Sequence, residues 1–183
     1  IVRGSGLNGL SCMKAKSGNI IRPLLQTSKA DIWLYIKQNK LKYRTDKSNA
    51  DTKFTRNSVR HKLLPYLEKN FNPSIVQTLS QWSMTIADDY EFIEQKAESF
   101  VTAACKNKCV YFSAEKFLQL HPSIQRQVLR NIFMKLKNGT QDVENKQIEE
   151  ILKVVKSVKS KNQKATIGGL KISKKGDKID IFC

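Results

Sequence analysis

RTDKSNAD at residues 44–51 and FTRNSVRHKLLPYL at residues 54–67 carry more patterned chemistry than any other part of the chain. The Asp, Ser and Asn side chains of the first stretch can accept hydrogen bonds from nearby backbone amides, which favours turns and helix starts. In the second stretch Val59, Leu63 and Leu67 recur every four residues, a spacing typical of the buried stripe of an amphipathic helix. The two stretches therefore predict a polar loop that leads into a helix.

Arg56 and Arg60 lie one helical turn apart, on a different face from the apolar stripe. Two guanidinium groups on one face suit phosphate oxygens, because each group is a planar fork of donors that stays charged at physiological pH. A solvated basic face is the alternative, since such faces are common in chains with a positive charge balance. Spacing alone leaves both interpretations open.

The net charge of +17 is distributed unevenly along the 183 residues. Residues 1–70 carry +11, residues 71–140 carry +2, and residues 141–183 carry +4. A polyanion is the natural partner of such a surface, because neutralised phosphates release counterions and the charge attracts the ligand over a distance. The alternative is a general lysine enrichment that keeps the chain in solution.

The composition, with 40% hydrophobic residues, predicts a soluble protein of one domain or two small ones. No run approaches the roughly 20 apolar residues of a membrane span, and Ile1-Val2-Arg3 does not open a signal peptide. The four cysteines are too sparse for a disulfide framework, which favours a reducing cytoplasm. Cys105 and Cys109 lack the second close pair that a zinc site needs, so we expect ordinary thiols and no metal site.

Helical periodicity dominates the rest of the chain. We expect a helix that Ser28 caps through its hydroxyl and that ends at about Asn39, and a long helix from Asn72 to about Ala104. On the long helix we expect Trp82 to lie in the core of the second domain and the acidic residues to form a solvated face. The acidic residues of that face are Asp88, Asp89, Glu91, Glu94 and Glu98.

Shorter elements follow the long helix. The pattern predicts a short strand at 110–112 and helices at 113–118, 122–137 and 148–155, with Arg126 and Arg130 on the outside of the middle helix. Alternating residues between 165 and 181 predict a small two-stranded hairpin at the end. The fold class expected from these patterns is mostly α.

Four motifs occur in the order in which a known family carries them. RGSGLNGL at residues 3–10, IRPLL at 21–25, D-x-S-N-x-D at 46–51 and R-N-x-x-R-H-x-L-L-P at 56–65 resemble the end of the catalytic domain of the tRNA(Ile)-lysidine synthase family, which are N-type ATP pyrophosphatases. The resemblance implies that residues 1–71 end an α/β PP-loop (Rossmann-like) catalytic domain. Residues 72–183 resemble, more weakly, the family's helical tRNA-binding domain.

The resemblance also implies an activity and its partners. The family's enzymes attach lysine to C2 of the wobble cytidine of tRNA(Ile) and convert ATP to AMP and pyrophosphate. The implied partners are tRNA(Ile) with a CAU anticodon, lysine and ATP, with Mg²⁺ accompanying ATP, in the cytoplasm; a homodimer is compatible with this reading. The family's S-G-G-x-D-S nucleotide-binding loop does not occur in the 183 residues, so we interpret the chain as a carboxyl-terminal fragment that is inactive alone.

Site residues follow from the resemblance position by position. Arg3 and Gly4 would border the adenylate, and Asp46, Asn49 and Asp51 would shape the loop. The residues that would hold phosphate or tRNA are Arg56, Asn57, Arg60 and His61. A solvated or structural imidazole is the alternative for His61. The catalytic residues are not assigned, and a non-enzymatic basic RNA-binding module of the same helical fold is the alternative function.

Overall fold

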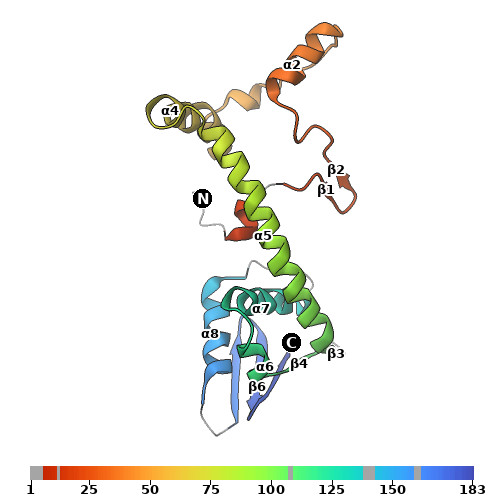
Figure 1. Cartoon of the computed structure of the whole chain (residues 1–183), viewed down its shortest axis with the longest axis vertical. Coiled ribbons are helices and arrows are strands. Elements are labelled where there is room, and N and C mark those ends of the chain that lie inside the picture. Colours follow the sequence, from red (N-terminus) through yellow and green to blue (C-terminus); the bar gives the residue numbers. More distant parts are fainter. Residues whose placement is uncertain (1–5, 12, 107–108, 138–142, 159–161) are drawn as a thin grey trace. The chain divides into compact units, whose positions relative to one another are not determined.

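The computed structural model describes residues 6–11, 13–106, 109–137, 143–158 and 162–183. The chain divides into two compact units, residues 1–87 and residues 88–183, each described here by itself (Figure 1). The division falls within the long helix α5 (Ile75–Ala104). The domain boundary that we predicted at residues 71 and 72 stays a prediction. Among the described residues, no helix has both the length and the apolar content that crossing a membrane requires.

The first unit consists of short helices and one small ribbon. Before α5 its elements are α1 (Leu7–Leu10), β1 (Lys16–Ser17), β2 (Ile20–Ile21), α2 (Lys29–Gln38), the 3-10 helix η1 (Lys47–Ala50), α3 (Thr55–Ser58), the π-helix η2 (Val59–Leu63) and α4 (Leu64–Asn70). β1 and β2 pair in antiparallel fashion. The predicted capping of α2 is confirmed, because Ser28 Oγ accepts a hydrogen bond from the Asp31 amide at 3.1 Å.

Burial in the first unit differs from the expectation. Among its described residues only Asn57, 7% exposed, is buried. Val59 and Leu67 are half-buried and Leu63 is 41% exposed, so the predicted buried stripe is wrong. The core position predicted for Trp82 is also wrong, since its side chain is 62% exposed. Apolar periodicity predicts which face of a helix is apolar, but it carries no information about what covers that face.

The second unit has a single antiparallel sheet of five strands in the order β3-β4-β7-β6-β5. After α5 its elements are β3 (Cys105–Lys106), β4 (Cys109–Ser113), α6 (Ala114–Leu118), α7 (Pro122–Leu136), α8 (Asn145–Lys156), β5 (Gln163–Ile167), β6 (Leu170–Lys175) and β7 (Lys178–Phe182). The closing segment therefore has three strands, not the two predicted. The mostly helical class is confirmed, although the sheet is larger than predicted because β4 joins β7 from far away in the sequence.

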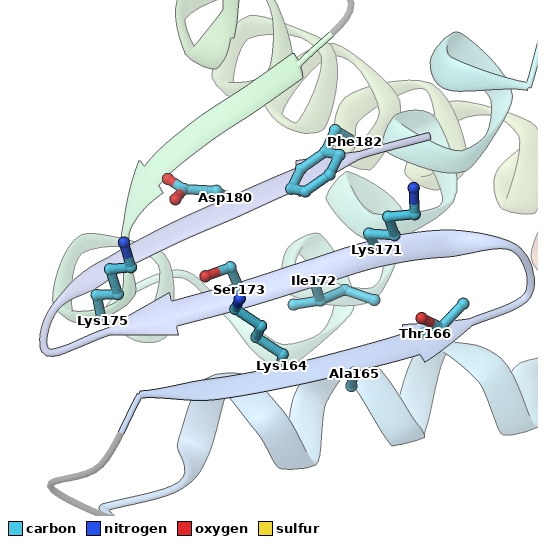
Figure 2. A pocket seen from close by; sticks show the side chains of 9 residues that line it. All are labelled: Lys164, Ala165, Thr166, Lys171, Ile172, Ser173, Lys175, Asp180 and Phe182. Atoms are coloured by element: carbon cyan, nitrogen blue, oxygen red, sulfur yellow. The ribbon is translucent and has the colours of Figure 1, made fainter.

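One face of this sheet carries the core of the second unit. α8 has four buried residues at helical spacing, Ile148, Ile151, Leu152 and Val155. They pack in one cluster with the inward residues of the sheet, which include Leu170, Ile172, Ile179 and Ile181. Residues alternate between buried and more exposed along β6 and β7, so the other face of the sheet is open (Figure 2).

A two-glycine turn connects β5 to β6. Gly168 and Gly169 both have positive φ, 55° and 76°, which is the backbone that a tight hairpin turn requires. A Cβ atom on Gly168 would lie 2.9 Å from the Phe133 ring. The turn therefore needs glycine for its backbone conformation and, at Gly168, for space as well.

The acidic face of α5 is only partly solvated. Glu94 Oε2 accepts a hydrogen bond from Gln127 Nε2 at 2.7 Å, and Glu94 Oε1 accepts one from Asn131 Nδ2 at 3.0 Å. Asn131 Nδ2 also lies 3.5 Å from Glu98 Oε2. Gln127 and Asn131 are buried on α7. Glu94 and Glu98 therefore contact α7 and do not face solvent alone, which differs from the predicted solvated face. The residue pattern of α5 alone does not reveal hydrogen-bond donors that lie on another helix.

Glu94→Ala is expected to lower the free energy of unfolding by about 1–3 kcal/mol, because the buried amides of Gln127 and Asn131 each lose the acceptor of their shortest hydrogen bond. The matched control is Asp89→Ala, which removes an exposed carboxylate from the same helix and should change stability by no more than about 0.5 kcal/mol. Urea unfolding followed by circular dichroism measures both. Equal effects of the two substitutions would contradict a stabilising contact between α5 and α7.

Candidate functional site

The loop before the arginine helix is built from turns closed by side chains. Asp46 Oδ1 accepts a hydrogen bond from the Ser48 amide at 2.9 Å and caps η1, and Asp51 Oδ1 accepts one from the Lys53 amide at 3.0 Å. The hydrogen bonds from the Ser48 amide and then its hydroxyl lower the pKa of Asp46 below its usual value. These contacts confirm the loop-shaping role expected of the two aspartates.

Two helix residues hold this loop in place. Asn57 Nδ2 donates to the carbonyl oxygens of Ser48 at 2.8 Å and Asp51 at 2.9 Å. His61 Nε2 lies 3.0 Å from the Asn49 carbonyl oxygen, and because a carbonyl only accepts, this nitrogen carries the hydrogen. Both amide hydrogens of Asn57 are therefore committed to the loop.

The sequence pattern by itself does not predict this contact between the helix and the loop, although the spacing of Asn57 and His61 is a signal for it. Asn57 and His61 are four residues apart, so both can reach the same neighbouring segment. We had assigned both to phosphate or tRNA, and that assignment stays a prediction. The structure places their bonded atoms against the loop backbone instead of in solvent.

The helix that carries the arginines is interrupted by a π turn. In η2 the Leu64 amide donates to the Val59 carbonyl, five residues earlier. Pro65 follows, and in a regular α-helix its ring would clash with the carbonyl four residues before it, that of His61. A wider turn at this point relieves the clash. The turn begins between Arg56 and Arg60, so the two lie on a distorted helix and not on the regular one assumed from spacing.

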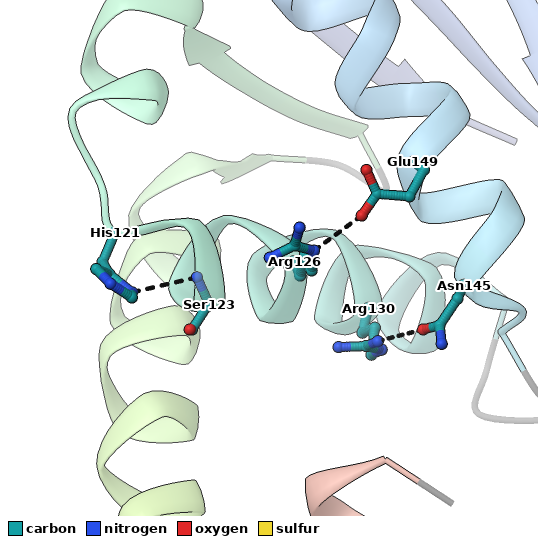
Figure 3. Close-up of polar contacts among 6 residues, drawn as sticks. All are labelled: His121, Ser123, Arg126, Arg130, Asn145 and Glu149. Carbon is teal, nitrogen blue, oxygen red and sulfur yellow. Dashed lines mark hydrogen bonds and ion pairs between the residues drawn. The ribbon is translucent and has the colours of Figure 1, made fainter. Parts of the chain in front are cut away.

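Arg56 and Arg60 are both exposed, and neither side chain makes a hydrogen bond or ion pair with any described residue. The sequence offers one other pair of arginines four residues apart, Arg126 and Arg130 on α7. Those two are engaged by α8, since Arg126 Nε lies 2.8 Å from Glu149 Oε1 and Arg130 donates to Asn145 Oδ1 at 2.6 Å (Figure 3). The Arg126 contact lowers the pKa of Glu149. Of the two pairs, only Arg56 and Arg60 have guanidinium groups with no hydrogen bond to a described residue, so all their donors are available to a ligand.

Other predicted site features have mixed outcomes. Arg3 and Gly4 lie outside the described residues. No group of three or more His, Cys, Asp or Glu side chains lies close together in the described part of the chain. Cys105, Cys109 and Cys183 are free thiols.

Asn57→Ala is expected to release residues 47–51 from the helix, because two loop carbonyls lose their donor. Amide hydrogen exchange in this loop should become at least about 10-fold faster, which corresponds to the loss of about 1.4 kcal/mol. Asn70→Ala is the matched control, since Asn70 Nδ2 bonds only to the Tyr66 carbonyl of its own helix. Unchanged exchange in the loop of the Asn57 variant would show that other contacts hold it.

Comparison with known proteins agrees with the motifs. Residues 1–67 match the PP-loop domain family, an ATP-binding family. The chain is 30% identical to the tRNA(Ile)-lysidine synthase of Caldanaerobacter subterraneus subsp. tengcongensis over 157 residues, which cover 85% of the chain and 34% of that protein. For the tRNA(Ile)-lysidine synthase of Clostridioides difficile the identity is 33%, over 83% of the chain and 34% of the relative.

A third relative shows a similar identity over a similar share of the chain. The tRNA(Ile)-lysidine synthase of Francisella philomiragia is 34% identical over 158 residues, which cover 84% of the chain and 38% of that protein. The chain thus spans about a third of the length of the curated relatives that it matches. Residues 1–67 therefore match the PP-loop domain family, and the chain is homologous to part of the tRNA(Ile)-lysidine synthases.

Proposed function

We propose that the chain is the tRNA-holding part of a ligase that attaches lysine to C2 of the wobble cytidine of tRNA(Ile), with ATP converted to AMP and pyrophosphate. The observation that carries the proposal is the alignment of more than four-fifths of the chain with proteins named tRNA(Ile)-lysidine synthase. Exposed arginines beside a loop within the PP-loop match support it.

The chemistry explains the need for ATP. The C2 oxygen of cytidine is a poor leaving group. When that oxygen attacks the α-phosphorus of ATP, an O–P bond forms and pyrophosphate leaves. The lysine amine then attacks C2, the C2–O bond breaks, AMP leaves and the amine loses a proton to solvent or a base. The enzyme must therefore hold a polyanionic RNA beside ATP for the first step and the adenylated RNA beside lysine for the second.

In this proposal the described residues divide into two roles. Arg56 and Arg60 bind phosphate oxygens of the tRNA near the reacting base, since each presents an unpaired fork of donors. Asn57 and His61 position the loop at residues 47–51, through which they would affect RNA binding indirectly. Arg3 and Gly4 would border the adenylate. Magnesium bound with ATP would neutralise phosphate charge, and no residue described here is assigned to it.

The test uses the full-length protein that contains these residues, called the translation product below. It is incubated with a tRNA(Ile) transcript that has a CAU anticodon, labelled lysine and ATP. We expect lysine to be incorporated into the tRNA, with one AMP released per lysine. Binding of the tRNA without any AMP release would favour a non-enzymatic RNA-binding module. An S-G-G-x-D-S loop encoded upstream of Ile1 would favour the ligase.

Two further features belong to the proposal. A cytoplasmic location follows from its tRNA substrate. A homodimer stays a prediction, which the molar mass of the translation product in solution would test. Neither feature changes the roles assigned to Arg56 and Arg60.

A further inference from the structure

The open face of the five-stranded sheet has an unusual set of side chains. The strand register brings Lys171 beside Phe182, Lys164 beside Ser173, and Lys175 beside Lys178. All four lysines are exposed, and the only acidic residue on this face within the described strands is Asp180. The face is therefore basic, whereas the opposite face of the same strands is apolar and buried.

Lys174 lies on the inward face of the sheet and differs from the outward lysines because its ammonium group is hydrogen-bonded. Lys174 Nζ donates to the carbonyl oxygens of Val155 at 2.5 Å and Ser157 at 2.7 Å, at the end of α8. It thereby stabilises the carboxyl end of a helix. Lys164, Lys175 and Lys178 have no hydrogen bond or ion pair with any described residue. Their ammonium groups are available to a ligand.

Aromatic rings lie among these lysines. Tyr111 of β4 is 48% exposed and pairs across the strands with Asp180 of β7. It lies on the same face of the sheet as Phe182, which is two residues from Asp180. Lys171 Nζ lies 6.0 Å from the centre of the Phe182 ring. Phe182, which is half-buried, borders an open hollow of about 490 Å³ over β5, β6 and β7 together with Lys164, Lys171 and Lys175 (Figure 2). Cations interleaved with accessible rings suit unpaired nucleotides, because lysines bind phosphates while bases stack on rings.

The turn that carries two of the lysines is held in place. The Glu115 amide donates to Asp177 Oδ1 at 2.7 Å, and the Ala114 amide donates to the Asp177 carbonyl at 2.7 Å. A hydrogen bond with the Ser113 hydroxyl, followed by the bond from the Glu115 amide, lowers the pKa of Asp177, so it stays ionised. Lys175 and Lys178 flank this anchored turn, and their backbone is ordered before any ligand binds.

We propose that this open sheet face, formed by Lys164, Lys171, Lys175, Lys178, Tyr111 and Phe182, binds an unpaired segment of RNA. The proposal rests on the proposed function for the class of its partner, and it adds a second contact surface to the arginine helix. Charge complementarity selects a polyanion, and the exposed Tyr111 ring with the half-buried Phe182 ring selects nucleotides among polyanions. An acidic peptide or an anionic membrane would use the lysines but would leave the rings without a stacking partner.

The experiment measures binding of the chain to an unstructured 12-nucleotide RNA and to a tRNA(Ile) transcript at several salt concentrations. A triple variant, Lys164→Gln, Lys171→Gln and Lys175→Gln, should weaken binding at least 10-fold at low salt. It should also reduce the slope of log affinity against log salt by about 2, since each phosphate contributes about 0.7 for single strands. Tyr111→Ala should weaken binding several-fold without changing the slope, because stacking is not ionic.

The control triple removes the same charge from exposed helix positions: Lys116→Gln, Lys135→Gln and Lys153→Gln. Equal losses in both triples would overturn the proposal in favour of a diffuse attraction. Displacement of the RNA by poly-glutamate or by phosphatidylserine vesicles at equal charge concentration would overturn it as well. Circular dichroism checks that each variant is folded, as expected for exposed positions.

The same variants separate this inference from the proposed function. If the translation product releases no AMP with tRNA while the sheet triple still loses RNA binding, the ligase proposal fails and the RNA-binding face stands. If the product incorporates lysine and the sheet triple binds RNA like the control triple, the ligase proposal stands and the RNA-binding face is wrong.

Discussion

Arg60→Ala in the translation product is expected to lower kcat/KM for the tRNA about 10- to 100-fold while leaving the fold intact. Hydrogen bonds to a charged group contribute about 1.5–3 kcal/mol, which corresponds to this range. Arg60 is exposed and has no described partner inside the chain, so its removal should cost little stability. Lysine incorporation at varied tRNA concentrations, with circular dichroism of the variant, measures both effects.

Two further variants test whether the loss of kcat/KM is caused by removal of the guanidinium group. Arg60→Lys keeps the charge but loses the planar fork, so it should recover only part of the activity. Lys69→Ala removes one exposed positive charge from the following helix and should lower kcat/KM less than threefold. If Lys69→Ala were as damaging as Arg60→Ala, the helix would act only through its overall charge. Unchanged turnover of Arg60→Ala would remove Arg60 from the site.

Phe117→Ala is expected to lower the free energy of unfolding of the second unit by about 3–5 kcal/mol. Phe117 is fully buried, and its ring centre lies 5.1 Å from that of Phe112 and 6.0 Å from that of Phe100. Truncation would therefore leave a cavity beside the Phe100 and Phe112 rings and remove the edge-to-face contact with Phe100 and the tilted contact with Phe112. Urea unfolding followed by far-UV circular dichroism measures the loss.

Trp82→Ala is the matched substitution on α5, and it should cost less than about 1 kcal/mol. Both substitutions remove a large aromatic ring, but the Trp82 ring is 62% exposed. Its truncation therefore uncovers little buried surface. A loss at Trp82 as large as that at Phe117 would mean that this ring is covered in solution, as the sequence pattern had suggested.

Sequence reasoning succeeded where the physical cause is local. Ser28 caps α2 because its hydroxyl needs only the amide three residues further on, and the aspartates of the loop bond to amides two residues away. The family motifs gave the same assignment as the comparison with known proteins, because they occur as short ordered words in the sequence. Helices with strong periodicity were predicted near their observed bounds, as α7 and α8 show.

It failed where a distant segment decides the environment of a side chain. Glu94 was assigned to solvent because the Gln127 and Asn131 amides that bond to it lie on another helix. The two-stranded hairpin became part of a five-stranded sheet because β4 pairs with β7 across about 70 residues of sequence. Alternation within a strand indicates its buried face, but it does not identify which distant strand will pair with it.

The sequence by itself determined the helix caps, the polar loop, the arginine spacing and the family of the first 67 residues, since each depends on neighbours a few positions apart. Only the tertiary structure decided which of these groups are free to act. It committed Asn57 and His61 to the loop backbone and Arg126 and Arg130 to α8, and it left Arg56 and Arg60 without partners among the described residues. It also gathered lysines from three strands onto one open face. A side chain can offer a ligand only the donors that the fold leaves unpaired, and that depends on segments that meet in space.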